Sequence, residues 1–295
     1  MDQAEQLRNI IKAGNVKRSR PLARVITVTS GKGGVGKSNT AINLAIQFRK
    51  MGKKVVILDA DFGLANIEIM FGAVPKHNLS DLIYQGKNIK DIITWGPMEV
   101  GFISGGSGIT GLSNLSKDYL MYIVHNLAEL DTIADVIIVD TGAGISDAVL
   151  EFLVASGEIL LVTTPEPTSI TDSYSLLKAL NGHPGLERDN TQICMIANRV
   201  SSANEGEVLF QKLDVVVSRY LKLPITYLGA VPQDPLLAKA VMQQFPVSLQ
   251  NPQARSAQAY EEIAAKLMKQ DEGQNTQKRG VAAFFSHIIG KRNNG

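Results

Sequence analysis

Residues 31–38 read GKGGVGKS, which satisfies the phosphate-binding pattern G-x-x-x-x-G-K-[ST]. An apolar, β-branched run, RVITVTS, precedes the stretch at residues 24–30, and the apolar spacing of residues 38–50 is typical of a helix. Between a strand and a helix, such a loop can turn its backbone N–H groups toward phosphate oxygens. The stretch therefore predicts a loop that binds the phosphates of a nucleotide.

Two side chains of this loop have a predicted role in phosphate chemistry. We expect Lys37 to bring its charge to the β- and γ-phosphates and Ser38 to offer its hydroxyl to Mg²⁺. The residues expected to contact the nucleotide here are Gly31, Lys32, Gly33, Gly34, Val35, Gly36, Lys37, Ser38 and Asn39.

Further buried-strand patterns follow along the chain, separated by segments with helical spacing. The strands are predicted at residues 54–60, 134–140, 158–164, 193–199 and 225–231, with a weaker one at 100–104. The helices are predicted at residues 117–130, 168–180, 207–221 and 254–269. Strands apolar on both faces, alternating with helices, are typical of a mostly parallel sheet that helices cover on both faces. We predict one α/β domain over residues 23–270.

Composition excludes several classes of protein. The 295 residues are 44% hydrophobic and 20% charged, as in ordinary globular proteins, and the formal net charge is +2. This near-neutral balance gives no electrostatic argument for nucleic-acid binding. The single cysteine, Cys194, excludes an internal disulfide, a multi-thiolate zinc site and an iron–sulfur cluster held by this chain alone. The polar N-terminus is no signal peptide, and no apolar run reaches the ~18 residues that span a bilayer.

Acidic residues close two of the predicted strands. Asp140 ends VIIVD, where an acid could hold Mg²⁺ through water, and Asp59 and Asp61 lie in LDAD two residues apart. Aspartates at strand ends also serve as plain turn or helix-cap residues. The neighbouring phosphate loop favours the functional interpretation.

Lys32, a second lysine inside the loop, makes the loop resemble that of the MinD/ParA family of ATPases. The resemblance extends over residues 24–269 and implies an ATP-dependent homodimer in which Lys32 reaches the nucleotide of the facing subunit. By the same resemblance Asp61 orients the attacking water, and Asp59 supports Mg²⁺ together with Ser38 and Asp140. The implied catalytic residues are thus Lys32, Lys37 and Asp61. A surface lysine on a glycine turn is the alternative for Lys32.

Other stretches resemble the family's nucleotide-contacting loops. Gly142 stands where members usually carry proline, yet its backbone N–H remains available to the γ-phosphate. Asn198 and Arg199 close one strand, and Pro232 and Asp234 follow the next, as in the family's adenine-contacting loops. Two ordinary polar turns are the alternative. Because no N-K-x-D stretch is present, the sequence favours ATP over GTP.

The N-terminal segment, residues 1–22, contains DQAEQLR and is similar to the opening of FlhG (YlxH/FleN) flagellar-number regulators. The resemblance implies that it stimulates an FlhF-type GTPase. The residues implied in this contact are Asp2, Gln3, Ala4, Leu7 and Arg8. A solvated helix with no special role is the alternative.

The C-terminal segment begins with a polar stretch, residues 271–277, predicted as a flexible linker. Residues 278–292 then show the i, i+3, i+4, i+7, i+8 pattern of one apolar helix face, with basic pairs on both sides. We predict an amphipathic helix that binds an anionic membrane surface through this face. The alternative is a helix that packs on the core. The apolar residues are Val281, Phe284, Phe285, Ile288 and Ile289.

Together these features predict an ATPase switch with bound ATP or ADP and Mg²⁺, regulating flagellar number and placement. The expected partners are a second copy, an FlhF-type GTPase, flagellar C-ring proteins and the inner face of the cell membrane, reached reversibly from the cytoplasm. A MinD-type division-site ATPase is one alternative. A ParA-type DNA-partitioning ATPase is another, which the near-neutral charge disfavours.

Overall fold

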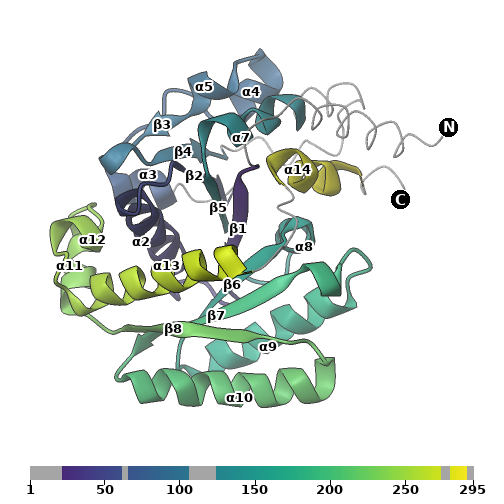
Figure 1. Ribbon diagram of the computed structural model, residues 1–295, viewed down its shortest axis with the longest axis vertical. Helices are drawn as coiled ribbons and strands as arrows, with labels where there is room; N and C mark the ends of the chain where they lie inside the picture. The colour runs from purple at the N-terminus through teal and green to yellow at the C-terminus, as the bar shows by residue number, and fades with distance from the viewer. Residues whose placement is uncertain (1–21, 62–65, 106–123, 274–279, 291–295) are drawn as a thin grey trace.

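The computed structural model describes residues 22–61, 66–105, 124–273 and 280–290. Strands and helices alternate along most of this chain, so that a central sheet lies between layers of helices (Figure 1). The strands are β1 (Arg24–Thr29), β2 (Val55–Ala60), β3 (Thr94–Trp95), β4 (Gly101–Ser104), β5 (Val136–Thr141), β6 (Glu158–Thr163), β7 (Gln192–Val200) and β8 (Thr226–Pro232).

The strands form one eight-stranded sheet in the order β3-β4-β2-β5-β1-β6-β7-β8. Every neighbouring pair is parallel except β3 and β4. The central strands are apolar on both faces because both faces carry helices. The sequence prediction of an α/β fold with a mostly parallel sheet is therefore confirmed, and each of its strands is present.

The helices are α2 (Lys37–Lys50), α3 (Asn66–Phe71), α4 (Leu79–Gln85), α5 (Ile89–Ile92), α7 (Leu130–Ile133), α8 (Asp147–Ala155), α9 (Pro167–Gly182), α10 (Ala203–Leu221), α11 (Pro235–Met242), α12 (Val247–Gln250), α13 (Arg255–Gly273) and α14 (Gly280–Gly290). Two short 3₁₀ turns are η1 (Pro97–Glu99) and η3 (Arg188–Asn190). One face of the sheet packs on α2 and α13. The other packs on α4, α5, α7, α8 and α14 beside β2 and β5, and on α8, α9 and α10 beside β6 and β7.

Two predicted boundaries differ from the structure. Helix α13 continues to Gly273, so the first three residues of the predicted linker 271–277 are helical. Polar residues sustain a helix that runs on into solvent, and low apolar content alone does not end one. Residues 117–123 of the predicted helix 117–130 lie outside the described residues, and 124–128 are helical.

Helix α14 does not stand apart from the domain. Its apolar face is buried in the same core cluster as β2, β5 and α8, and Figure 1 shows it beside α7 and α8. The sequence predicts a tail helix that binds a membrane, with packing on the core as the alternative. In the described structure the apolar face of this helix packs on the core. No helix in the described ranges is long and apolar enough to cross a membrane.

Candidate nucleotide-binding site

The phosphate-binding loop lies where the central strands end. Because β1, β2 and β5 are parallel neighbours, their carboxyl ends meet at one edge of the sheet. The register places Asp59 of β2 beside Asp140 of β5, and Asp140 also pairs with Val28 of β1. Topology thereby brings the two predicted metal-side acids to the loop that follows β1.

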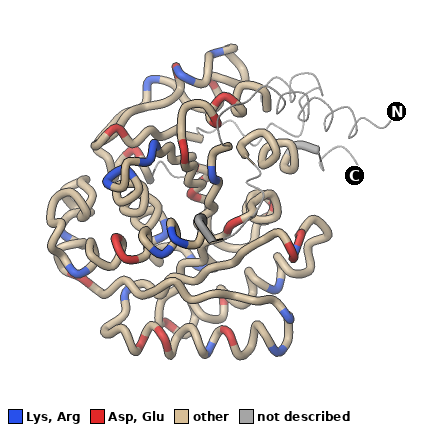
Figure 2. The backbone as a smooth tube through the Cα atoms, viewed as in Figure 1, with Lys and Arg blue, Asp and Glu red and all other residues tan. Residues whose placement is uncertain are grey.

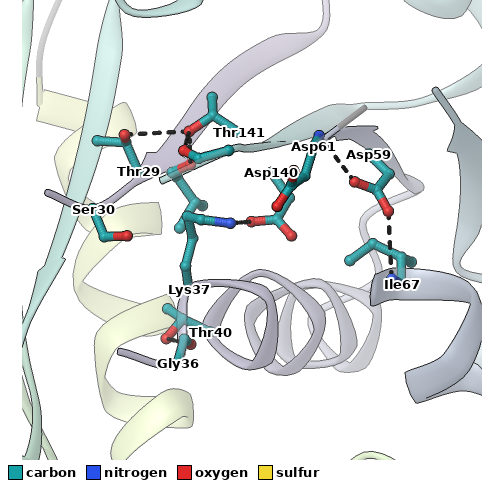
Figure 3. Close-up of polar contacts among 12 residues, drawn as sticks. Thr29, Ser30, Gly36, Lys37, Thr40, Asp59, Asp61, Ile67, Asp140 and Thr141 are labelled. Carbon is teal, nitrogen blue, oxygen red and sulfur yellow. Dashed lines mark hydrogen bonds and ion pairs between the residues drawn. The ribbon is translucent and has the colours of Figure 1, made fainter. Parts of the chain in front are cut away.

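Lys37, the first residue of α2, reaches this edge with its ammonium group. Its Nζ donates to Asp140 Oδ1 at 3.1 Å, and both side chains are buried. Figure 3 shows the two pointing toward each other, with Asp59 and Asp61 beside them. Gly36 just before has φ +97°, a left-handed conformation, and a Cβ there would collide with the side-chain amide of Asn198. Glycine is therefore required where the loop turns into the helix.

Burial controls the charge of both acids. It raises the pKa of Asp140, and the neighbouring Lys37 charge and Ser38 hydroxyl oppose this rise. Burial, and next the charge of Asp140, raise the pKa of Asp59 from 3.8 to about 7. Two neighbouring buried carboxyl groups, of which Asp140 is paired with Lys37, form a site whose negative charge a divalent cation would neutralise.

The residues present fit Mg²⁺ as part of a nucleotide complex. Asp140 Oδ2 is buried with no hydrogen-bond partner among the described residues, so this oxygen is available as an acceptor or a metal ligand. No cluster of three or more His, Cys, Asp or Glu that could hold a metal by itself occurs in the described part of the chain. Mg²⁺ usually keeps waters and phosphate oxygens and takes one or two carboxylates from the protein, which suits Asp59 and Asp140 beside the Ser38 hydroxyl.

Asp61 lies just beyond the end of β2, at the rim of the site. Its backbone N–H donates to Asp59 Oδ1 at 3.1 Å, and the N–H of Ile67 donates to Asp59 Oδ2 at 3.4 Å. Asp59 therefore fixes the turn that carries Asp61 to the rim. A Cβ on Gly142 would lie 3.6 Å from the Asp61 carboxylate, so these two residues are adjacent at the rim of the site.

Lys32 lies on the exposed outer side of the loop. Its Nζ donates to Glu166 Oε2 and to Thr168 Oγ1, each at 2.8 Å. This contact, and secondarily the charge of Arg199, hold the pKa of Glu166 below its usual value. Glu166 and Thr168, at the start of α9, are residues to which the sequence argument gave no role. The signal was present, because TTPEP at 163–167 directly follows a buried strand.

The predicted base-contacting residues lie on the β7 and β8 side of the loop. Asn198 is buried and its Nδ2 donates to the Val35 carbonyl at 2.6 Å, while its Oδ1 has no partner among the described residues. Arg199 is exposed, with φ +58°. Asp234 Oδ1 accepts from the Leu236 N–H at 2.9 Å and caps α11. Its Oδ2 accepts from the N–H and hydroxyl of Ser256 at 3.0 and 2.8 Å.

The predicted base-contacting residues therefore differ in what they can still bind. Asn198 supports the phosphate loop and keeps one buried acceptor, Oδ1. Both carboxylate oxygens of Asp234 already accept hydrogen bonds at the starts of α11 and α13. Pro232 ends β8 and pairs with Val200.

The predicted terminal contacts are described only in part. Asp2, Gln3, Ala4, Leu7 and Arg8 lie outside the described residues, as does the Ile289 side chain. The other apolar residues of the tail are buried against the domain, with exposed fractions of 0% for Val281, 1% for Phe284, 6% for Phe285 and 5% for Ile288.

Comparison with known proteins agrees with this geometry. The family model described as ParA, NUBPL iron-transfer P-loop NTPase, matches residues 21–268. The antiactivator FleN of Pseudomonas aeruginosa is 38% identical over 83% of this chain and 86% of its own. The flagellum site-determining protein YlxH of Helicobacter pylori is 32% identical over 98% of both chains.

Solved structures share the fold. The septum site-determining protein MinD of Pyrococcus horikoshii, complexed with Mg-ADP, superposes with a TM-score of 0.66 at 23% identity, covering 85% of this chain and 98% of that one. The chain therefore belongs to the MinD/ParA family of P-loop NTPases, in the FlhG branch that includes FleN and YlxH.

Proposed function

We propose that this protein is a Mg²⁺-dependent ATPase switch that dimerises with ATP and regulates flagellar number and placement. The observation that carries the proposal is the buried Lys37–Asp140 pair at the end of the phosphate loop, with Asp59 and Asp61 beside it. The MinD relative bound to Mg-ADP and the flagellar relatives FleN and YlxH support it.

In this proposal each side chain has one task. Lys37 leaves Asp140 to bind the β- and γ-phosphates, and Asp140 turns to the metal side with Asp59 and Ser38. Mg²⁺ supplies charge neutralisation for the phosphates when bound. Asp61 accepts a hydrogen bond from the attacking water and orients it in line with the γ-phosphate. The Asn198 Oδ1 acceptor suits the amino group of adenine.

Dimerisation completes the site. Lys32 is partly exposed, and its ammonium group is bound by Glu166 and Thr168. It takes no part in the Lys37–Asp140 pair of the same subunit. A facing subunit would give Lys32 a phosphate in place of a carboxylate, and the closed interface would exclude water. A cation placed against charge that develops in the transition state is the principle of the arginine finger.

The cellular role follows from the relatives and the termini. We propose that residues 1–22 stimulate an FlhF-type GTPase, that C-ring proteins are further partners, and that α14 binds the anionic inner face of the membrane. The protein then moves between the cytoplasm and that surface. Because α14 is docked in the described structure, membrane binding requires its release from the domain.

Two assays separate this function from its alternatives. A pull-down with an FlhF-type GTPase distinguishes the FlhG function, which predicts capture, from a MinD-type division-site function, which predicts none. Co-sedimentation with ATP tests membrane against DNA: anionic liposomes should carry the protein down and duplex DNA should not. Figure 2 shows Lys and Arg interspersed with Asp and Glu around the described chain, which disfavours a DNA-binding face. DNA binding without liposome binding would overturn the proposal in favour of a ParA-type function.

A further inference from the structure

Helix α14 begins at a point where two distant parts of the chain meet it. Asp131 of α7 is only 6% exposed, and its Oδ1 accepts from the backbone N–H of Val281, in the first turn of α14, at 3.0 Å. The same Oδ1 accepts from the backbone N–H of Ala23 at 3.2 Å, one residue before β1. One buried carboxylate thus binds the start of the C-terminal helix and the end of the N-terminal segment.

Gly280 fits this junction in a way that other residues would not. Its φ is +60°, and a Cβ there would approach Leu22 Cδ2 at 3.1 Å and Asp131 Oδ2 at 3.2 Å. Only a residue without a side chain lets α14 start this close to Leu22 and Asp131. A carboxylate at the first turn of a helix also interacts favourably with the helix dipole.

From this geometry we infer that Leu22, Ala23, Asp131, Gly280 and Val281 form a terminal clasp that holds α14 on the domain and couples its release to the N-terminal segment. The consequence for lipid rests on the proposed function, whereas the clasp itself does not. Asp131 is then a positioning residue: it contacts no nucleotide and acts by setting the balance between docked and released α14.

Docking of α14 is the net result of two opposing contributions. Burying the four large side chains of its apolar face favours docking, and the conformational entropy lost on ordering the helix opposes it. The hydrogen bond from Val281 and the close start at Gly280 add to the docked side of this balance.

Coupling between the two ends follows from the shared acceptor. When α14 leaves, water reaches Asp131 and competes for its oxygen, so the bond from Ala23 weakens. By reciprocity, a partner of the N-terminal segment that draws Leu22 and Ala23 away from Asp131 favours release of α14 by the same free energy. The clasp therefore couples release of Ala23 to release of α14.

Hydrogen exchange of the full-length, nucleotide-free protein tests the clasp. In Asp131→Ala the amides of α14 should exchange about tenfold faster or more, because a buried donor loses its acceptor. Glu129→Ala is the matched control, since it removes an exposed carboxylate two residues away from Asp131. Amides of β7 and α9 report whether the fold is intact.

Gly280→Ala tests the coupling without altering Asp131 or Ala23. It should raise exchange of the α14 amides and also of the Ala23 amide. Unchanged α14 exchange in both Asp131→Ala and Gly280→Ala would overturn the clasp. Faster α14 exchange with an unchanged Ala23 amide in Gly280→Ala would overturn the coupling.

Flotation with vesicles of phosphatidylglycerol and phosphatidylethanolamine separates this inference from the proposed function. Both variants should float without ATP to a greater extent than the Glu129→Ala control. Variants that release α14 by hydrogen exchange yet do not float support the clasp and refute the membrane role of the helix.

Discussion

At the scale of single residues, three aspartates and one lysine lie together at the edge of the sheet, and Mg²⁺ with a nucleotide would balance their net negative charge. Lys37 is the sole cation paired with Asp140 among the described residues, and Asp59 and Asp61 lie next to the pair. The four side chains come from three elements that the parallel topology brings together. Their proposed roles differ, so their substitutions should have different effects.

Asp61→Ala should abolish ATP turnover and leave an ATP-bound dimer, because water orientation is lost while the phosphate contacts remain. Lys37→Gln should lose turnover and dimerisation together, because it removes the charge that holds the phosphates. Phosphate release and light scattering after size-exclusion chromatography measure the two properties. Turnover at the wild-type rate in Asp61→Ala would show that another group orients the water.

Lys32→Ala separates binding from dimerisation. Since Lys32 lies outside its own Lys37–Asp140 pair, the variant should bind ATP as a monomer with an affinity within a few fold of wild type. It should not dimerise, and its turnover should fall about 10²-fold or more, the loss typical of a missing transition-state cation. Fluorescent-nucleotide titration and light scattering decide this. An intact ATP-dependent dimer of Lys32→Ala would contradict the role assigned to Lys32.

Asp59 makes the stability of the nucleotide-free protein depend on pH. Its pKa is about 7 in the folded chain and 3.8 by reference, so the folded state holds the extra proton between these values. Stability from this group is therefore fully present below about pH 3.8 and lost progressively as pH rises to about 7. The advantage of Asp59→Asn, which cannot ionise, over wild type should therefore be larger at pH 8 than at pH 5, by about 1–3 kcal/mol.

Urea unfolding without nucleotide or Mg²⁺ measures this difference. Glu129→Gln, at an exposed position away from the site, is the control and should show no such pH dependence. An equal difference between Asp59→Asn and wild type at pH 5 and pH 8 would contradict the assigned cause.

At the scale of elements, the N-terminal segment can be tested apart from the ATPase domain. Residues 1–22 should stimulate the partner as an isolated peptide, because the resemblance assigns the stimulation to this segment and a short segment can fold on its partner. A synthetic peptide of residues 1–20 should accelerate GTP hydrolysis by an FlhF-type GTPase, in a steady-state phosphate-release assay. A peptide with Gln3, Leu7 and Arg8 replaced by alanine should be much less active. No acceleration by the native peptide at saturation would refute the module.

The central strands and the phosphate loop could be predicted from sequence because local signals determine them. A buried parallel strand is a short apolar run, and the loop is a fixed spacing of glycines, lysine and serine between a strand and a helix. The sequence placed Asp59 and Asp140 near the ends of strands, but their pairing depends on β2 and β5 being neighbours, which only the sheet order shows.

Contacts between distant segments could not be predicted in this way. The apolar face of α14 has the same pattern whether it enters a membrane or packs on a domain, and only its packing against α7 and α8 in the folded chain distinguishes the two. The contact of Lys32 with Glu166 spans 134 residues. The use of both Asp234 oxygens as caps depends on Ser256, on a later helix.

At the scale of the whole molecule, we propose a switch with two linked sites. In this proposal the nucleotide edge responds to ATP by dimerisation, and α14, which packs on the other face of the sheet from α2, provides the membrane contact after its release. One released α14 helix binds lipid weakly, and two on one dimer gain effective concentration and bind firmly. In this proposal nucleotide controls location, with no membrane-spanning helix in the described chain.

Flotation of the full-length protein with anionic liposomes, compared in ATP and in ADP, tests this central claim most directly. Binding should require ATP, persist in Asp61→Ala, weaken as salt is raised, and vanish in the double variant Phe284→Glu/Phe285→Glu. The double variant should still form the ATP-dependent dimer, which shows that its nucleotide edge is intact. Equal flotation of the wild-type protein in ADP and in ATP would contradict the switch, even if α14 binds lipid.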